Sequence, residues 1–147
     1  MPYPTSPHAS AELRTLVARL AQDLGVDVCS LYKLDPTGTQ LTLVATHGLS
    51  QSSVGYRMPI SLGLTGRVAR IKKVVAVKDP MSHPDYHHVV GSGEERYKTF
   101  LGIPIHGKEG LLGVLVVQTI EPHLFLLQEI AQIHATGRDV EPWLRAA

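Results

Sequence analysis

Cysteine is almost absent from this sequence: Cys29 is the only one among 147 residues. A single thiol excludes an internal disulfide and a zinc site built from cysteines, because each needs more than one of them. Cys29 lies in an apolar run of strand-forming residues. This setting favours a small buried hydrophobic side chain over a reactive thiol.

Basic clusters and long apolar runs are missing as well. The formal net charge is +1, from 14 Lys and Arg against 13 Asp and Glu, and no four basic residues gather into a cluster. The chain therefore lacks the basic face that neutralises nucleic-acid phosphates. No stretch approaches the ~18 consecutive apolar residues of a membrane span, and MPYPTSPHAS at the N-terminus does not resemble a signal peptide. We expect a cytoplasmic protein that binds neither nucleic acid nor membrane.

The hydrophobic content is ample in comparison, at 44% of 147 residues. This is the size and composition of one domain with a single sizeable core. Residues 1–9 contain three prolines and little apolar pattern, which predicts a flexible lead-in. We therefore expect one domain over residues 10–137, followed by a tail at residues 138–147.

Apolar residues at helical spacing predict two long helices. The first covers residues 11–24, with Ser10 as its N-cap and Gly25 as its stop. The second covers residues 122–135 and ends near Gly137, with a proline in its first turn. Each helix has one apolar stripe to bury.

Strand-forming residues separated by turn sequences predict two antiparallel hairpins. The first joins residues 26–34 to residues 40–46 through the turn DPTGT. The second joins residues 99–105 to residues 111–119 through HGKEG. Between them we expect the extended piece YRMPI, a short helix capped by Ser61 and the strand KVVAV.

These elements predict an α+β domain with a central antiparallel sheet. Because tight turns join most of the strands, neighbouring strands run antiparallel, and the two long helices must cover one face of the sheet. The other face is left to the short helix and to the irregular residues 78–97. A long irregular segment inside a compact domain is more often functional than idle, so we expect it to form a mobile lid over a pocket, with Gly91 and Gly93 permitting the movement.

From Leu13 to about Gln118 the chain carries a family resemblance. The motifs are GEERYKTFLGIPI, GLLGVLVVQ, VDVCSLYKLD, THGL and GLTGRVA, with the pairs Asp79-Pro80 and His83-Pro84. Together they resemble a GAF domain, and in particular the N-terminal GAF sensor domain of the nitrogen-related phosphoenolpyruvate-protein phosphotransferase and the sensors of NifA-type regulators. YHHVV and the C-terminal sequence after Gln118 depart from that narrower pattern.

The resemblance implies a regulatory sensor and not an enzyme. Its small-molecule effector would be linked to nitrogen or carbon metabolism, such as glutamine or 2-oxoglutarate, and the domain would be a homodimer or a module of a phosphotransferase or regulator in a longer chain. Homodimerisation would use the two long helices, with Phe125 and Leu126 off the stripe that faces the sheet. Phosphotransferase activity is not implied, because its catalytic domains lie outside the GAF region.

A charge triplet stands directly before the second hairpin. Arg96 is suited to bind a carboxylate or phosphate ligand, with Glu94 and Glu95 orienting it or binding an amine. Replacing Arg96 with Ala would then abolish the binding of such a ligand. The alternative is an ordinary solvated loop edge whose ion pairs contribute little.

Further candidates line the expected pocket. In the first strand, Ser30 and Tyr32 alternate onto one face and present hydroxyl groups, although both are also common as satisfied strand residues. The expected ligand-binding residues are Ser30, Tyr32, Thr65, Asp79, Tyr86, Glu94, Glu95, Arg96 and Phe100.

Three other interpretations remain open. His83 and His87 would share a face if their segment were helical, but no further ligands complete a known metal site, so we expect no metal and no cofactor. A pocketless scaffold is the main alternative function, with Met58, Tyr86 and Phe100 filling the interior. The third is an enzyme resembling the free methionine sulfoxide reductases, which would need an attacking and a resolving thiol.

Overall fold

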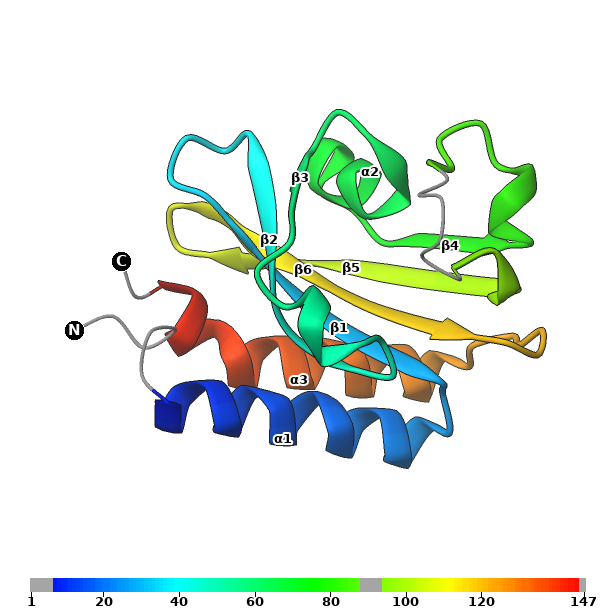
Figure 1. The fold of residues 1–147 in the computed structure, drawn as a ribbon, viewed down its shortest axis with the longest axis horizontal. Helices are drawn as coiled ribbons and strands as arrows, with labels where there is room; N and C mark the ends of the chain where they lie inside the picture. The colour runs from blue at the N-terminus through cyan, green and yellow to red at the C-terminus, as the bar shows by residue number, and fades with distance from the viewer. Residues whose placement is uncertain (1–6, 88–93, 146–147) are drawn as a thin grey trace.

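The computed structural model describes residues 7–87 and 94–145, and of residues 7–10 and 94 only the backbone. The elements are α1 (Pro7–Leu24), β1 (Val28–Leu34), β2 (Gln40–His47), β3 (Arg57–Pro59), α2 (Gly63–Ile71), β4 (Val75–Lys78), β5 (Thr99–Gly107), β6 (Gly110–Thr119) and α3 (Leu127–Arg145). The strands form one sheet in the order β3-β2-β1-β6-β5-β4, and every pairing is antiparallel (Figure 1).

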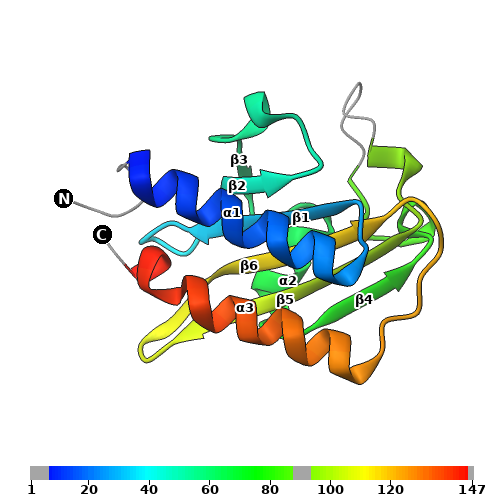
Figure 2. The same ribbon diagram turned by 90° about the horizontal axis from the view of Figure 1, so that it is seen from below.

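The two long helices lie side by side on one face of the sheet. Figure 2 shows α1 and α3 crossing the strands together, and Figure 1 shows α2 and β3 on the opposite side. This arrangement follows from the alternation of side chains along each strand. The expected α+β fold, with both long helices on the same face, is confirmed.

Strand alternation divides the interior into two cores. On the side of α1 and α3, Cys29 and Leu31 of β1 pack with Leu101 of β5. On the side of α2, Tyr32 of β1 packs with Phe100 of β5. The second core is the smaller one, and α2 covers only part of the sheet there (Figure 1).

A glycine lets α2 pack closely on the sheet. A Cβ atom on Gly102 of β5 would lie 2.7 Å from Val68 Cγ2 of α2. Such a distance is shorter than real Cβ contacts, so any larger residue at 102 would move the helix away from the strand. The helix packs mainly on β5 and on the neighbouring strand β6.

The first and second helices begin at different residues from those expected. α1 begins at Pro7 and not after Ser10, in agreement with the preference of proline for the first helical turn. The N-cap of α2 is Leu62, and no side chain caps this helix end, so Ser61 does not have the expected role. None of the helices in the two described ranges is long and apolar enough to cross a membrane.

The third helix was expected over residues 122–135, and this prediction was wrong at both ends. Its start is delayed because the Glu129 carboxylate accepts a hydrogen bond from the Leu126 backbone N–H at 2.8 Å and lies 3.1 Å from His123 Nε2. Gly137 does not end the helix, because it is buried inside α3, where a Cβ would lie 3.4 Å from Ile105 Cγ1. The expected tail is therefore helical as far as Arg145.

Candidate functional site

A cavity of about 350 Å³ lies between the sheet and the N-terminal end of α2. Its floor consists of sheet residues, among them Tyr32 of β1, Leu43 of β2, Phe100 of β5 and Gln118 of β6. This volume falls at the lower end of the range typical for small-molecule sites, which are mostly apolar with a few placed polar groups.

The register of the strands brings the polar floor residue next to an aromatic one. Gln118 pairs with Phe100 across β5 and β6, and with Val28 across β1 and β6. Along β6, Gln118 follows Val114 and Val116 with period two, so it faces the same side as these two core residues. On the α2 side of the sheet, Gln118 is therefore the polar residue that follows the apolar Val114 and Val116 of β6.

The N-terminus of α2 forms one wall of the cavity. Gly63, Leu64 and Thr65 line it, and Gly63 has a φ of 75°, which glycine adopts without steric cost. The first backbone N–H groups of a helix have no partner within the helix, and no side chain caps them here. They carry the fractional positive charge of the helix dipole and favour an electronegative atom.

Two polar side chains point into this cavity without a protein partner. Thr65 and Gln118 are each 8% exposed and both line the cavity. Within residues 7–87 and 94–145, the Thr65 hydroxyl and the Gln118 side-chain amide form no hydrogen bond. Neither polar group is among the fully enclosed ones that lack a partner in the described ranges, so both are accessible from the cavity and available to a bound molecule.

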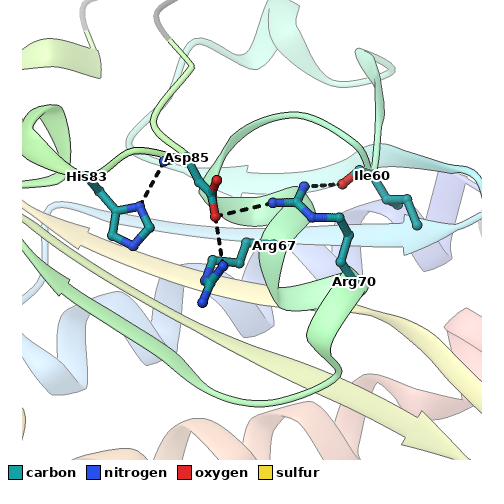
Figure 3. Close-up of polar contacts among 5 residues, drawn as sticks. All are labelled: Ile60, Arg67, Arg70, His83 and Asp85. Atoms are coloured by element: carbon teal, nitrogen blue, oxygen red, sulfur yellow. Dashed lines mark hydrogen bonds and ion pairs between the residues drawn. The ribbon is translucent and has the colours of Figure 1, made fainter.

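An ion-pair network joins the segment after β4 to α2 (Figure 3). Asp85 Oδ2 lies 2.8 Å from Arg67 Nη1 and 3.4 Å from Arg70 Nη2. Arg70 also donates to the backbone carbonyl of Ile60, just before α2, and His83 Nδ1 accepts a hydrogen bond from the Asp85 backbone N–H at 3.0 Å. The network positions the following residues, Tyr86 and His87, on the cavity wall.

Four of the residues expected from the sequence line this cavity: Tyr32, Thr65, Tyr86 and Phe100. Ser30 is on the same face of β1 but does not line the cavity. Its side chain is fully buried, and its hydroxyl forms a hydrogen bond with Thr46 Oγ1 at 2.8 Å. Of the expected lid over residues 78–97, residues 88–93, with Gly91 and Gly93, lie outside the described part of the chain.

The charged candidates are not part of the described cavity lining. Arg96 is exposed: its guanidinium carbon lies 5.2 Å from the centre of the Tyr97 ring, and Nη2 donates to the Tyr97 hydroxyl at 3.2 Å. Tyr97 takes the buried place on the cavity wall, whereas Arg96 lines a separate groove with Asp79. Glu95 is exposed, and the side chain of Glu94 lies outside the description.

Sequence reasoning missed Gln118 and Tyr97. Gln118 ends an apolar strand, so its position resembles a surface boundary until the register places it beside Phe100. Tyr97 directly follows the charge triplet, in which Arg96 was the expected ligand-binding residue. The useful signal was a polar or aromatic residue at the edge of a buried strand, on the face opposite to the long helices.

Cys29 is on the other side of the sheet from the cavity. It is fully buried in the core formed with α1 and α3, and burial raises the pKa of its thiol to about 12. A neutral buried thiol is a poor nucleophile. Within the described ranges no three His, Cys, Asp or Glu residues form a group that could hold a metal ion, and His83 is engaged with the Asp85 backbone instead.

The amino-acid sequence is similar to those of known proteins. The model of the GAF domain family matches residues 8–141. The chain is 33% identical over 103 residues to a protein of Escherichia coli K12 named phosphoenolpyruvate-dependent phosphotransferase system, and an equal match is found in Salmonella typhimurium. The matched region covers 69% of this chain but only 14% of the relative, so the chain spans a small part of the length of these proteins.

Solved structures give the same picture. The GAF domain from a phosphoenolpyruvate-protein phosphotransferase of Coxiella burnetii has a TM-score of 0.80 and 33% identity, with 95% of this chain and 86% of that chain covered. A type II free methionine-R-sulfoxide reductase from Thermoplasma acidophilum has a TM-score of 0.77 over 92% of this chain and 91% of its own. Its 15% identity shows a shared fold alone.

Proposed function

This chain belongs to the GAF domain family, a regulatory sensor type of domain, and on that basis we propose that it senses a small molecule bound between the sheet and α2. One observation carries the proposal. Thr65 and Gln118 are nine-tenths buried, lack partners among the described residues and face the same cavity of about 350 Å³. A bound ligand would satisfy both groups.

The scaffold alternative requires a filled interior. Met58, Tyr86 and Phe100 were the side chains expected to fill it, and all three belong to the cavity wall. The space they enclose matches a small-molecule site in size and in its mixture of apolar and polar lining. This observation supports sensing over a purely structural role.

The reductase alternative requires thiol chemistry in the cavity. Cys29 is the only cysteine of the sequence, it is buried on the α1 and α3 side, and burial raises its pKa to about 12. A mechanism with an attacking and a resolving thiol needs two cysteines. The chemistry of this side chain supports a regulatory role in place of a thiol-dependent reaction.

The relatives suggest the wider setting of the domain. Because the sequence relatives are phosphotransferase proteins of which this region covers 14%, we propose that the domain acts as a regulatory module in a longer chain. Its effector would report on nitrogen or carbon supply, with glutamine and 2-oxoglutarate as the first compounds to test. Binding in the cavity would be transmitted through the sheet to α1 and α3.

We further propose that the domain is a homodimer. Leu127, the first residue of α3, is 86% exposed, and Leu124 and Leu126 just before it are 73% and 53% exposed. Phe125, which the sequence placed on the outside, is half-buried against the helix-side core and packs edge-on to His123 at a ring distance of 4.6 Å. The three neighbouring leucines form an apolar patch of the kind that marks an interface.

A thermal-shift screen tests the sensing function. Amino acids, 2-oxo acids, nucleotides and neutral amides would be added singly, because a ligand that binds only the folded state raises stability by RT ln(1 + [L]/Kd). Leu62→Trp places a larger ring at the mouth of the cavity and should weaken the shift. Ile71→Trp, on an exposed residue outside the cavity, is the matched control. No shift with any compound would favour the scaffold.

A further inference from the structure

The described lining of the cavity contains no Asp, Glu, Lys or Arg. It is made of aliphatic and aromatic side chains, with hydroxyl groups, the Gln118 amide and His87 as its polar members. From this composition, and resting on the proposed sensing function, we propose that the cavity selects an uncharged, mainly apolar molecule with one amide-like end. Charged metabolites of the same size would be rejected.

Neighbouring charges do not alter this conclusion. Arg67 and Arg70 are engaged with Asp85 in the network beside α2, and Arg96 lies over the Tyr97 ring and lines a separate groove. Residues 88–93 are outside the described part, but their sequence HVVGSG contains no Asp, Glu, Lys or Arg either. Glu94 follows them. It could form an ion pair only with a cationic ligand, and the test below includes such a ligand.

Electrostatics sets the selection against charge. A carboxylate or ammonium group that enters an apolar cavity loses its hydration and must find an opposite charge to compensate. Within the described lining, the groups that can attract an anion are the uncapped N-terminus of α2, which carries a fraction of a unit charge, and the basic side chain of His87. A full anion would gain more attraction there than a carbonyl oxygen, but a fraction of a unit charge does not offset the hydration that the anion loses.

Two side chains recognise the polar end. The Gln118 amide has a donor NH₂ and an acceptor oxygen, and the Thr65 hydroxyl can donate or accept. A primary amide presents the complementary pair, with its oxygen toward the N–H groups of α2 and its NH₂ toward Gln118 or Thr65. Glutamine carries such an amide but also an ammonium and a carboxylate group, so it is disfavoured together with 2-oxoglutarate, which has a carboxylate at each end.

Benzamide, benzoate and benzamidine test the charge selection, because they share one ring and one size but are neutral, anionic and cationic near neutral pH. Titration calorimetry should give a benzamide affinity about tenfold or more above that of either ion. Tighter binding of benzoate or benzamidine would overturn the inference and leave the sensing function intact. Failure of benzamide, both ions and toluene to bind would remove both.

Variants test the recognition of the amide. Gln118→Leu and Thr65→Val keep the volume and should each lower the affinity for benzamide about fivefold or more, with little change for toluene. Gln132→Leu on α3 and Thr15→Val on α1 are exposed matched controls that should change neither affinity. Arg96→Ala should also leave benzamide binding unchanged. Equal affinities in wild type and Gln118→Leu would overturn the assignment, and toluene binding reports whether each variant keeps a folded cavity.

Discussion

The Asp85 carboxylate accepts a hydrogen bond from Arg67 Nη1 at 2.8 Å, and this contact fastens the segment after β4 to helix α2. Arg70 reaches the same oxygen at 3.4 Å. Because the three side chains are partly exposed, the network is worth about 1 kcal/mol or less in stability. Its main effect is local, since it holds Tyr86 and His87 against the cavity.

Asp85→Asn should therefore loosen the cavity wall without unfolding the domain. We expect faster amide hydrogen exchange at residues 80–87, little change in the denaturation midpoint and weaker ligand binding. Asp139→Asn, an exposed change on α3, is the control. If exchange at residues 80–87 stayed at the wild-type rate, the network would have no role in holding this segment.

Asp35 makes the first hairpin sensitive to acid. Its carboxylate accepts hydrogen bonds from Thr37 Oγ1 at 2.7 Å, from the Gln40 N–H at 3.0 Å and from the Thr39 N–H at 2.9 Å. These bonds lower its pKa from the usual 3.8 to about 2. A lowered folded-state pKa stabilises the fold above the unfolded value, and this contribution is lost as the pH falls from 3.8 toward 2.

Asp35→Asn should consequently be less stable than the wild type at neutral pH, and the difference should shrink as the pH approaches the lowered pKa. Urea denaturation across this pH range measures the free energy of unfolding of both proteins. Glu109→Gln in the turn of the second hairpin is the control, because Glu109 is exposed there. A stability difference that did not depend on pH would show that charge at Asp35 is not the cause.

Two helical glycines should respond in opposite ways to alanine. A Cβ on Gly66 of α2 would lie 2.6 Å from the Ile60 carbonyl oxygen, whereas a Cβ on Gly137 of α3 meets only ordinary contacts at 3.4 and 3.5 Å. Alanine gains about 1 kcal/mol of helix propensity over glycine. We expect Gly137→Ala to be neutral or stabilising and Gly66→Ala to lose about 1–3 kcal/mol, because the clash with backbone exceeds that gain. Thermal unfolding measures the change in stability of both variants. Equal changes for the two would disprove the close approach at Gly66.

The exposed leucines at the start of α3 predict self-association. Leu127→Glu should convert the proposed dimer into a monomer in sedimentation velocity at micromolar concentration, because a buried unpaired charge is too costly to keep. Val54→Glu, an exposed change between β2 and β3, should leave the dimer intact. A wild-type protein that is monomeric throughout this concentration range would remove the proposal.

Local sequence chemistry was enough to predict the strands. DPTGT and HGKEG supply their turns within a few residues, and the strands on each side alternate or run apolar as the sheet requires. The same locality explains α1. These elements depend on their own residues and their nearest neighbours, so a single sequence contains the information.

Glu129 sets the start of α3 locally, through its bond to the Leu126 N–H, but the connector before the helix and the end of the helix depend on distant residues. The connector before it is held by a hydrogen bond from the His123 N–H to Thr99 Oγ1 at 3.0 Å, at the start of β5. Gly137 continues the helix because it packs on Ile103 and Ile105 of β5. No local pattern indicates such contacts. From the sequence, Pro122 and Gly137 were therefore interpreted as the usual boundaries of a helix.

The candidate site was predictable only in part for a related reason. Tyr32, Tyr86 and Phe100 were recognisable as aromatic or strand residues near the irregular segment, and the cavity includes them. Gln118 needed the register of β5 and β6, and the direction of Arg96 was decided by Tyr97, which occupies the buried position. A charge triplet alone does not reveal which of its side chains faces inward.

The most direct test of the account is to locate benzamide by titration in a proton–nitrogen correlation spectrum of the wild-type domain. We predict saturable shifts that are largest for the backbone amides of Gly63, Leu64 and Thr65 and for the side-chain NH₂ of Gln118, with smaller shifts in α1 and α3. Shifts confined to α1 and α3, or a spectrum unchanged at saturating benzamide, would contradict a ligand site between the sheet and α2.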